Sequence, residues 1–471
     1  MPVLPCRANL CLDHKSIYQF LLACQQNCQS NCTQFVSISL EIELVDPLVV
    51  FQEIAKPDRL NFYFENRGKG EAIAAIDAVA TLQLSGSRLR FAKAQEFINS
   101  CLANTISIGA INELFAGRHF FCSFSFFDQT SQVDYPFPAA TVFLPRWQVA
   151  NKRDRCVLVA NLVIQAGVNL NKILQELWET IEIIRCSQTS SKQTNNSRQE
   201  FVKQDVTVTD NFKRAVFSSL ASIRSNHLSK IVLAHAVDVT SGAPFSVFQS
   251  LKNLRRLHPD CYIFSTSNGK GQNFIGASPE RLISIFNQEL TTDALAGSAP
   301  RGKTAAEDAS LANRLLSSEK EMREHRVVID FITQSLYKLD LVPQVLSPRL
   351  RQLSNIQHLW TPIQAKVPAK LHPLEIVAQL HPTPAVAGAT RDIACAGIRR
   401  YESFERGLYA APLGWVDYQG NSEFIVGIRS ALIDGDRARL YAGAGIVAGS
   451  DPDKELAEIQ LKLQALLKAL V

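Results

Sequence analysis

Two segments with the periodicity of amphipathic helices carry carboxylates where apolar side chains are expected. In the first, residues 315–332, both Glu321 and Glu324 fall inside the arc of apolar residues at about 100° per residue. Ser318 can cap this helix with Glu321 as the acid of a capping box, which accounts for Glu321 but not for Glu324. An ionised carboxylate on a buried face is costly unless it is paired or binds a metal.

The second segment, residues 452–470, closes the chain. Glu455, Glu458 and Lys462 form a strip along the edge of its apolar side. Alone, this strip fits a surface Glu–Lys pair four residues apart, which is worth a few tenths of a kcal/mol. Two such helices favour a shared site for a hard cation, because Mg²⁺ characteristically takes one or two carboxylates plus substrate oxygens. The sequence therefore predicts an anionic substrate.

The segments SSEKEMREH (317–325) and GSDPDKELAEIQLKL (449–463) resemble the two magnesium-binding helices of the chorismate-utilising enzymes. This family includes the anthranilate, aminodeoxychorismate, salicylate and isochorismate synthases. The resemblance runs from about Asp210 to the C-terminus through several separate motifs, and it is much weaker over residues 1–200. It implies an enzyme that binds chorismate with Mg²⁺ as cofactor.

The resemblance assigns roles to four glutamates of the two helices. Glu324 and Glu458 are expected to bind Mg²⁺, which fixes the ring carboxylate and neutralises charge. Glu321 and Glu455 are expected to support them as additional ligands, directly or through water.

A lysine and a glutamate outside these helices complete an acid–base pair by the same resemblance. Lys230 begins the apolar strand SKIVLAHAV, and Glu280 follows a turn in FIGASPERLISIF. Taken alone, Lys230 fits a strand-end lysine that reaches solvent, and Glu280 fits a surface acid paired with Arg281. By the resemblance, Lys230 matches the lysine that is the general base in isochorismate and salicylate synthases, and Glu280 matches the general acid that protonates the departing C4 hydroxyl.

Seven further residues are expected to hold the substrate. Arg429 can bind the enolpyruvyl carboxylate through a bidentate fork, and the two glycines let backbone N–H groups approach a carboxylate. A lone histidine in an apolar stretch is more often a core residue. His358 nevertheless matches a family histidine that lies close to the substrate ring. The set is Tyr409, Arg429, His358, Ala385, Gly443, Gly445 and Lys462.

Two alanines indicate the branch of the family. Ala296 stands where aminodeoxychorismate synthases carry a lysine, so no covalent adduct is expected there. Ala385, in HPTPA, stands where anthranilate and salicylate synthases carry threonine. Together with Lys230, which ammonia-using members lack, this pattern resembles isochorismate synthases. Water would attack C2 of chorismate, the ring double bonds would shift, and the C4 hydroxyl would leave. Quinone synthesis, of menaquinone or phylloquinone, is the expected pathway.

Three alternatives remain open at this stage. A salicylate synthase would also eliminate pyruvate, and Ala385 argues against it. An anthranilate synthase would need a glutamine amidotransferase partner, and no such subunit is expected. A non-catalytic chorismate- or metal-binding relative would have no need of the acid–base pair.

The elements that must position these residues indicate an α+β fold. Strands follow one another without regular helical crossovers, which favours large mixed or antiparallel sheets with helices packed outside. The family implies that the sheets are layered as a sandwich. Residues 1–200 would be the N-terminal part of the fold, ending in a polar loop at 186–200, and residues 201–471 the chorismate-binding catalytic region.

Helices are predicted at 171–185, 211–225, 311–339, 373–380 and 452–470, and strands at 35–44, 155–164, 229–239, 261–267, 280–286, 414–418, 423–433 and 439–447.

Composition excludes several classes of protein. The chain has 471 residues and a net charge of +5 with scattered basic residues, so no nucleic-acid footprint is visible. No apolar run of about 20 residues predicts a membrane span, and the N-terminus lacks a secretory pattern. We expect a cytoplasmic monomer. The spacing of Cys24, Cys28 and Cys32 is no common metal signature, and it favours semi-buried thiols over a metal site.

Overall fold

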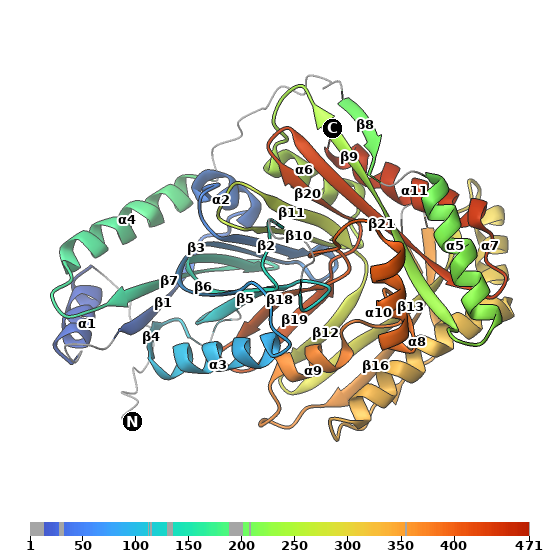
Figure 1. Cartoon of the computed structure of the whole chain (residues 1–471). Coiled ribbons are helices and arrows are strands. Elements are labelled where there is room, and N and C mark those ends of the chain that lie inside the picture. The colour runs from blue at the N-terminus through green and yellow to red at the C-terminus, as the bar shows by residue number, and fades with distance from the viewer. Residues whose placement is uncertain are drawn as a thin grey trace.

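The computed structural model describes residues 14–27, 33–111, 113, 115–129, 135–187, 201–206, 209–353 and 356–470. Its strands join into one continuous sheet that folds into two layers (Figure 1). Among the described strands every pair is antiparallel except β1 with β4. The predicted α+β class is therefore confirmed.

The two layers meet at β6 (Ala140–Lys152), whose two edges pair with different strands. One layer runs from β6 through β3 (Glu71–Leu84), β2 (Asn61–Asn66), β10 (Tyr262–Ser267), β11 (Asn273–Ser278), β20 (Ser430–Asp434) and β21 (Arg437–Val447) to β9 (Lys230–Ser241). The other runs through β5 (His119–Phe124), β18 (Pro412–Asp417), β19 (Ser422–Val426), β12 (Arg281–Phe286) and β13 (Glu289–Pro300) to β16 (Ile356–Lys366).

Short strands complete the edges. They are β7 (Arg155–Ile164), β1 (Gln34–Ile42) and β4 (Thr105–Gly109) beside β6, β8 (Phe201–Asp205) and β17 (Gly388–Ala389) beside β9, and β14 (Gln344–Val345) and β15 (Arg349–Gln352) beside β16. The pairs β2–β10 and β5–β18 join strands from before and after residue 200, so the sheet is continuous across the predicted boundary.

Aromatic side chains pack between the layers, as Phe62 on β2 and Phe121 on β5 do with ring centroids 5.3 Å apart. Helices cover the outside (Figure 1). The helices α5 (Thr209–Arg224), α10 (Arg391–Tyr401) and α11 (Pro452–Leu470) contact β9 or β21, α6 (Val247–Leu257) contacts β10 and β11, and α7 (Ala305–Ser317) and α8 (Glu319–Tyr337) contact β13 and β16. The remaining helices are α1 (His14–Asn27), α2 (Pro47–Ile54), α3 (Arg90–Ala103), α4 (Leu170–Cys186) and α9 (Pro373–Leu380).

Two predicted elements are each divided in the structure. The helix predicted at 311–339 is α7 followed by α8, because Ser318 leaves the helical conformation and its hydroxyl accepts a hydrogen bond from the N–H of Glu321. The strand predicted at 423–433 is β19 followed by β20, because Arg429 adopts a positive φ of 50° between them. Both breaks place charged side chains at the functional site.

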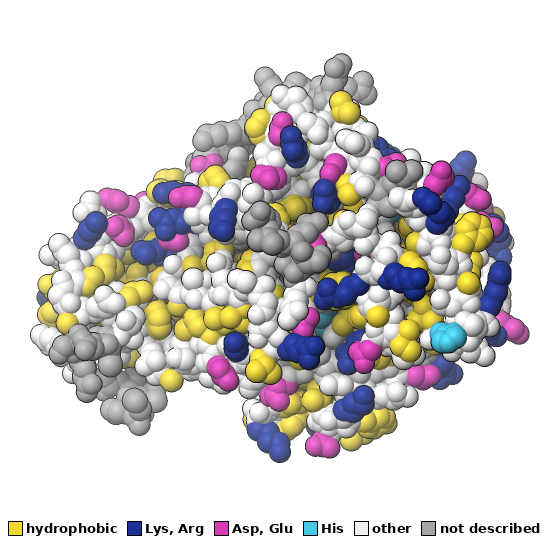
Figure 2. All heavy atoms as spheres, viewed as in Figure 1, with side chains coloured by type: hydrophobic (Ala, Val, Ile, Leu, Met, Phe, Trp, Pro, Cys, Tyr) yellow, Lys and Arg dark blue, Asp and Glu magenta, His cyan; other side chains and the backbone are white. Residues whose placement is uncertain are grey.

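The predictions on the cysteines, the loop at 186–200, membrane spans and surface charge concern parts of the chain outside the two sheet layers. Cys24 is a buried residue of α1, whereas Cys28 and Cys32 lie outside the described residues, as does most of the predicted loop at 186–200. No helix in the described part of the chain is long and apolar enough to cross a membrane. On the face shown in Figure 2, basic and acidic side chains are interspersed, without a continuous basic patch.

Candidate active site

One pocket lies between the two layers, with β9 and β21 on one side, β13 and β16 on the other, and α8 and α11 at one end. It brings together twelve of the thirteen predicted site residues, and Lys230 lies directly behind one of them. The predicted residues that line the pocket are Glu280, Glu321, Glu324, His358, Ala385, Tyr409, Arg429, Gly443, Gly445, Glu455, Glu458 and Lys462.

Two of these residues lie where the chain crosses from one layer to the other. Glu280 follows β11 and precedes β12, and Arg429 follows β19 and precedes β20. Each crossing is hydrogen-bonded to the strand that leads into the other crossing. The N–H of Val426 donates to the carbonyl of Glu280 at 3.1 Å, and the N–H of Ala277 donates to the carbonyl of Arg429 at 3.1 Å. The backbone therefore fixes both side chains at the pocket.

Lys230 is a buried residue at the start of β9 and does not reach solvent, which excludes the strand-end alternative. Its side chain is 2% exposed, and Nζ lies 2.8 Å from Oε1 of Glu324 on α8. Gly445 on β21 makes room for this pair, because a Cβ there would lie 3.0 Å from Glu324 Oε1 and 3.3 Å from Lys230 Cε. The basic and acidic residues are 94 positions apart in the sequence, and the sheet brings them together.

Glu280 is not the surface partner of Arg281, which instead forms an ion pair with Asp293 at 2.8 Å. The Glu280 side chain lines the pocket and is buried. Burial raises the pKa of its carboxyl to about 8, although the positive charge of Lys230 acts in the opposite direction. A carboxylic acid that remains protonated near neutral pH can donate a proton, so Glu280 has the property of a general acid.

The four glutamates of α8 and α11 converge on one end of the pocket. Burial, together with the negative charge of Glu324, raises the pKa of Glu321. Burial also raises the pKa of Glu455 to about 7, with a smaller contribution from Glu458. For Glu458, burial acts to raise the pKa, but the ammonium of Lys462 at 2.7 Å outweighs it, and the pKa is lowered. This end of the pocket therefore holds more carboxyl groups than basic partners.

That arrangement fits a divalent cation, which would relieve repulsion among the carboxylates. Glu324 and Glu458 each form an ion pair with a lysine, and their oxygens are the ligand type that Mg²⁺ prefers. The glutamates are not gathered closely enough to form a ready-made cage, and no cluster of three or more possible ligands occurs in the described residues. Such an ion would need oxygens from a substrate as well.

Glu321 does not close the predicted capping box with its own carboxylate. Ser318 caps α8, but Oε2 of Glu321 accepts a hydrogen bond from the N–H of Ser298 at 3.2 Å. Ser298 follows Gly297, which has a φ of 78° and marks a bulge between β13 and β16. The bulge turns the N–H of Ser298 toward α8, so Glu321 helps to fix β13 at the pocket.

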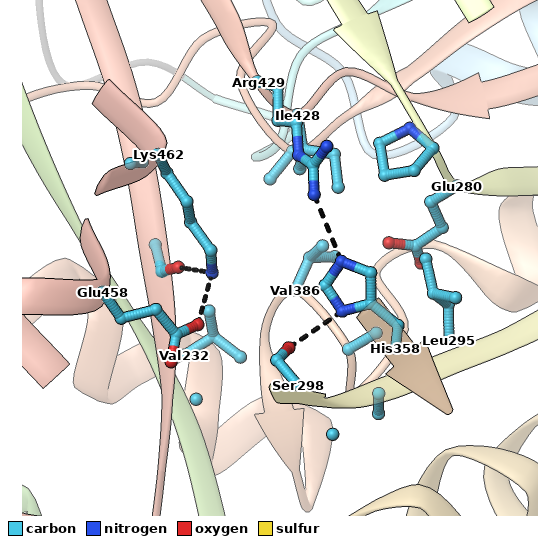
Figure 3. Close-up of a pocket in the computed structure, with 18 of the residues that line it drawn as sticks. Val232, Glu280, Leu295, Ser298, His358, Val386, Ile428, Arg429, Glu458 and Lys462 are labelled. Atoms are coloured by element: carbon cyan, nitrogen blue, oxygen red, sulfur yellow. Dashed lines mark hydrogen bonds and ion pairs between the residues drawn. The ribbon is translucent and has the colours of Figure 1, made fainter. Parts of the chain in front are cut away.

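Figure 3 shows a chain of hydrogen bonds along the opposite wall. The guanidinium Nη2 of Arg429 lies 3.1 Å from Nε2 of His358, and Nδ1 of His358 lies 2.8 Å from Oγ of Ser298. The Nη1 group of Arg429 is buried without a hydrogen-bond partner in the described part of the chain. An unsatisfied buried donor is costly, so this edge of the guanidinium is suited to bind an anion.

Tyr409 stacks on Tyr441 with ring centroids 5.2 Å apart, and both rings line the pocket. Beyond Tyr441, β21 pairs with β9 alone among the described strands, so one edge of its backbone has no strand partner there. There the carbonyl of Gly443 accepts a hydrogen bond from Nζ of Lys462 at 2.8 Å (Figure 3). A Cβ at Gly443 would lie 2.7 Å from the hydroxyl of Tyr409, so glycine keeps this edge accessible.

The family model described as chorismate binding enzyme matches residues 19–471. The chain belongs to this family. The match includes most of the N-terminal part, where the sequence motifs are weak. The relationship therefore extends over nearly the whole chain.

Curated and solved members of the family share most of this chain. The salicylate biosynthesis isochorismate synthase of Pseudomonas aeruginosa is 32% identical over 92% of this chain and 90% of its own length. The isochorismate synthase MenF of Bacillus subtilis is 30% identical over 93% of this chain and 94% of its own. The structure of MenF, the menaquinone-specific isochorismate synthase from Escherichia coli, superposes with a TM-score of 0.78 and 26% identity, covering 98% of this chain and 100% of the other.

The sequence alone did not identify several residues that line the pocket of this chain as site residues. They include Ser298, Lys320 and Tyr441. For Tyr441 a signal was present, because Tyr441, Gly443 and Gly445 alternate along β21 and so share one face. For Ser298 no local signal was present, since nothing in the neighbouring sequence links it to His358, 60 positions away.

A buried ion pair supports the pocket wall from behind. Arg406 and Glu402 are nearly inaccessible, and Arg406 donates at 2.8 Å to the carbonyls of Val232 and Val386, which both line the pocket. Glu402 accepts at 2.8 Å from the N–H of Ala234. The pair therefore ties β9 to the loop that carries Ala385.

Replacing Arg406 with methionine is expected to lower the free energy of unfolding by about 3–5 kcal/mol, because it leaves a buried carboxylate and two buried carbonyls without their partner. Urea denaturation measures this change. The matched control is Arg185→Met, which removes an arginine from an exposed pair with Glu182 and should cost less than about 1 kcal/mol. Equal, small losses for both variants would contradict the assigned role of Arg406.

Proposed function

We propose that the protein is an isochorismate synthase that isomerises chorismate to isochorismate with Mg²⁺ as cofactor. One observation carries the proposal: Glu280, a buried acid with a raised pKa, lines the pocket, and the buried Lys230 lies directly behind the pocket, paired with the lining residue Glu324. The pocket is lined by Ala296 and Ala385, where other branches of the family carry a lysine or a threonine. The names of the relatives in Pseudomonas aeruginosa and Bacillus subtilis support the same activity.

We assign the binding of chorismate to two basic side chains that line the pocket, Arg429 and Lys462. Arg429 offers its unpartnered Nη1 to the enolpyruvyl carboxylate, and Tyr409 lies beside that position. Lys462 projects from α11 toward the carboxylate-rich end, where the ring carboxylate is proposed to lie. A substrate held at both carboxylates presents its ring between Lys230 and Glu280.

The proton transfers follow from this placement. The ammonium of Lys230 first gives a proton to solvent, and the amine that remains takes a proton from the attacking water as the oxygen of that water bonds to C2. The electron pairs of the two ring double bonds shift around the ring, and the bond from C4 to its oxygen breaks. Glu280 donates a proton to the departing oxygen, which leaves as water. One water enters and one leaves, Lys230 is again an ammonium, and solvent returns the proton of Glu280.

Glu324 and Glu458 are the proposed Mg²⁺ ligands, with Glu321 and Glu455 in support. Bound there, Mg²⁺ would hold the ring carboxylate and neutralise developing charge. The ion pairs of Glu324 with Lys230 at 2.8 Å and of Glu458 with Lys462 at 2.7 Å support this assignment, because each carboxylate faces a basic group.

The change Glu324→Gln is expected to weaken Mg²⁺ binding at least about tenfold, because it removes a charged ligand. Calorimetric titration with Mg²⁺ in the presence of chorismate measures this affinity. Glu319→Gln makes the same change on the exposed face of α8 and should leave the titration unaltered. An unchanged titration for Glu324→Gln would rule out the two-helix metal site.

Salicylate synthesis is the second candidate, because one relative is named for salicylate biosynthesis. Both activities begin with isochorismate, so the first step is shared. The test is to incubate the purified protein with chorismate and Mg²⁺, without ammonia, and to separate the products chromatographically with a chelator control. Metal-dependent isochorismate supports the proposal. Salicylate with pyruvate supports the second candidate, and turnover only with added ammonia would refute both.

The pathway and cellular setting are part of the same proposal. The two MenF relatives favour menaquinone synthesis, with phylloquinone synthesis as the plant-type equivalent. We further propose a cytoplasmic monomer that works without a glutamine amidotransferase subunit, because water rather than ammonia is the nucleophile.

A further inference from the structure

We propose that Ser298 is a positioning residue whose hydroxyl accepts a hydrogen bond from Nδ1 of His358 and fixes the orientation of the ring, so that His358 holds Arg429 with Nη1 directed to the substrate carboxylate. The proposal rests on the proposed function, in which Arg429 binds that carboxylate. It adds a residue that does not touch the reacting atoms and acts through two others.

The direction of each hydrogen bond follows from the groups involved. A guanidinium can only donate, so Nε2 of His358, 3.1 Å from Nη2 of Arg429, must carry the lone pair. A neutral histidine then carries its proton on Nδ1, which donates to Oγ of Ser298 at 2.8 Å. The hydroxyl proton of Ser298 remains available to point elsewhere in the pocket, which Ser298 also lines.

The environment keeps His358 neutral. The ring is buried, and burial together with the positive charge of Arg429 holds its pKa well below the usual value. The backbone of Gly297 also lies within hydrogen-bonding reach of the ring and acts in the opposite direction on the pKa. A neutral ring has two tautomers, and only the one protonated on Nδ1 accepts from Arg429.

The backbone at Arg429 is held in place by its neighbours, which restricts the positions that the guanidinium can take. Its φ is 50°, and its carbonyl accepts from the N–H of Ala277. A Cβ on Gly276 would lie 2.7 Å from that carbonyl, so the crossing is closely packed. The thiol of Cys261 lies beside the guanidinium as well. With the backbone fixed, the hydrogen bond to His358 decides where Nη1 points.

Loss of the hydroxyl should therefore weaken substrate binding more than chemistry. In Ser298→Ala, Nδ1 of His358 loses the hydroxyl that accepts its proton, so the ring can turn away from Arg429. We expect KM for chorismate to rise about tenfold, the effect of losing a hydrogen bond to a charged group, with kcat changed less than about threefold. Ser298→Thr keeps the oxygen and should restore KM, and Ser225→Ala, at an exposed serine of the α5 end, should match the wild type.

A second background separates positioning from simple packing. In His358→Gln, the amide oxygen can accept from Arg429, and there is no imidazole Nδ1 for the hydroxyl of Ser298 to hold. Adding Ser298→Ala to this background should raise KM by less than about twofold if the hydroxyl acts through the ring. The same tenfold increase in both backgrounds would overturn the proposal, as would no increase in either.

The tautomer can also be read without turnover. Nitrogen NMR of the ¹⁵N-histidine-labelled protein should show His358 protonated on Nδ1 in the wild type and in Ser298→Thr. A ring protonated on Nε2 in the wild type would overturn the proposal. Because this spectrum needs no reaction, it stays informative if the protein forms a product other than isochorismate.

Discussion

Replacing Lys230 with methionine is expected to reduce the formation of isochorismate by about 10²–10⁴-fold, the contribution of a positioned general base. Methionine has similar length and volume but no amine, so the buried site should stay filled. Chorismate binding, measured by calorimetry in the presence of Mg²⁺, should persist because Arg429 and Lys462 are unchanged. Affinity for Mg²⁺ should rise, since Glu324 loses the cation that lies 2.8 Å away.

The matched control is Lys213→Met, which removes a lysine from a surface pair with Asp453 and should leave turnover unaltered. Near-normal turnover in Lys230→Met would refute the base assignment. Loss of chorismate binding together with turnover would instead indicate a role in holding the substrate.

Replacing Glu280 with glutamine is expected to lower turnover by about 10²–10⁴-fold, because the amide cannot supply a proton to the departing hydroxyl. In the wild-type protein, kcat/KM should fall as pH rises through about 8, where the buried carboxyl loses its proton. The sign follows from burial, which raises the pKa and keeps the acid protonated at neutral pH.

Glu289→Gln, on the exposed end of β13, controls for the substitution itself and should preserve both turnover and the pH profile. Activity that increases with pH through this range would contradict the acid role, because the ionised form of Glu280 would then be the active one. Glu280→Gln with normal turnover would contradict it as well.

Local signals were sufficient to predict the helices that carry the carboxylates. The carboxylate of Asp451 accepts from the N–H groups of Asp453 and Lys454, both at 3.0 Å, and the helix predicted at 452–470 coincides with α11. Ser318 caps α8 as its sequence context suggested, although the predicted helix had been drawn across it. Caps and periodicity depend on neighbouring residues, so the sequence displays them directly.

Features that depend on distant contacts were not predictable in this way. The segment around Arg429 is largely apolar, like a single buried strand, and only the crossing between layers makes it turn there. The partners of Lys230, Glu321 and His358 come from other elements, so no spacing rule specifies them. The family resemblance selected these residues, and the structure places them around one pocket.

The central claim, that water is the nucleophile, is tested most directly by running the reaction in H₂¹⁸O and analysing isochorismate by mass spectrometry at low conversion. One ¹⁸O atom per molecule, located on C2, is the result expected when Lys230 activates solvent water. Isochorismate without label would contradict the claim, because its hydroxyl oxygen would then have been transferred from C4 of the same substrate molecule.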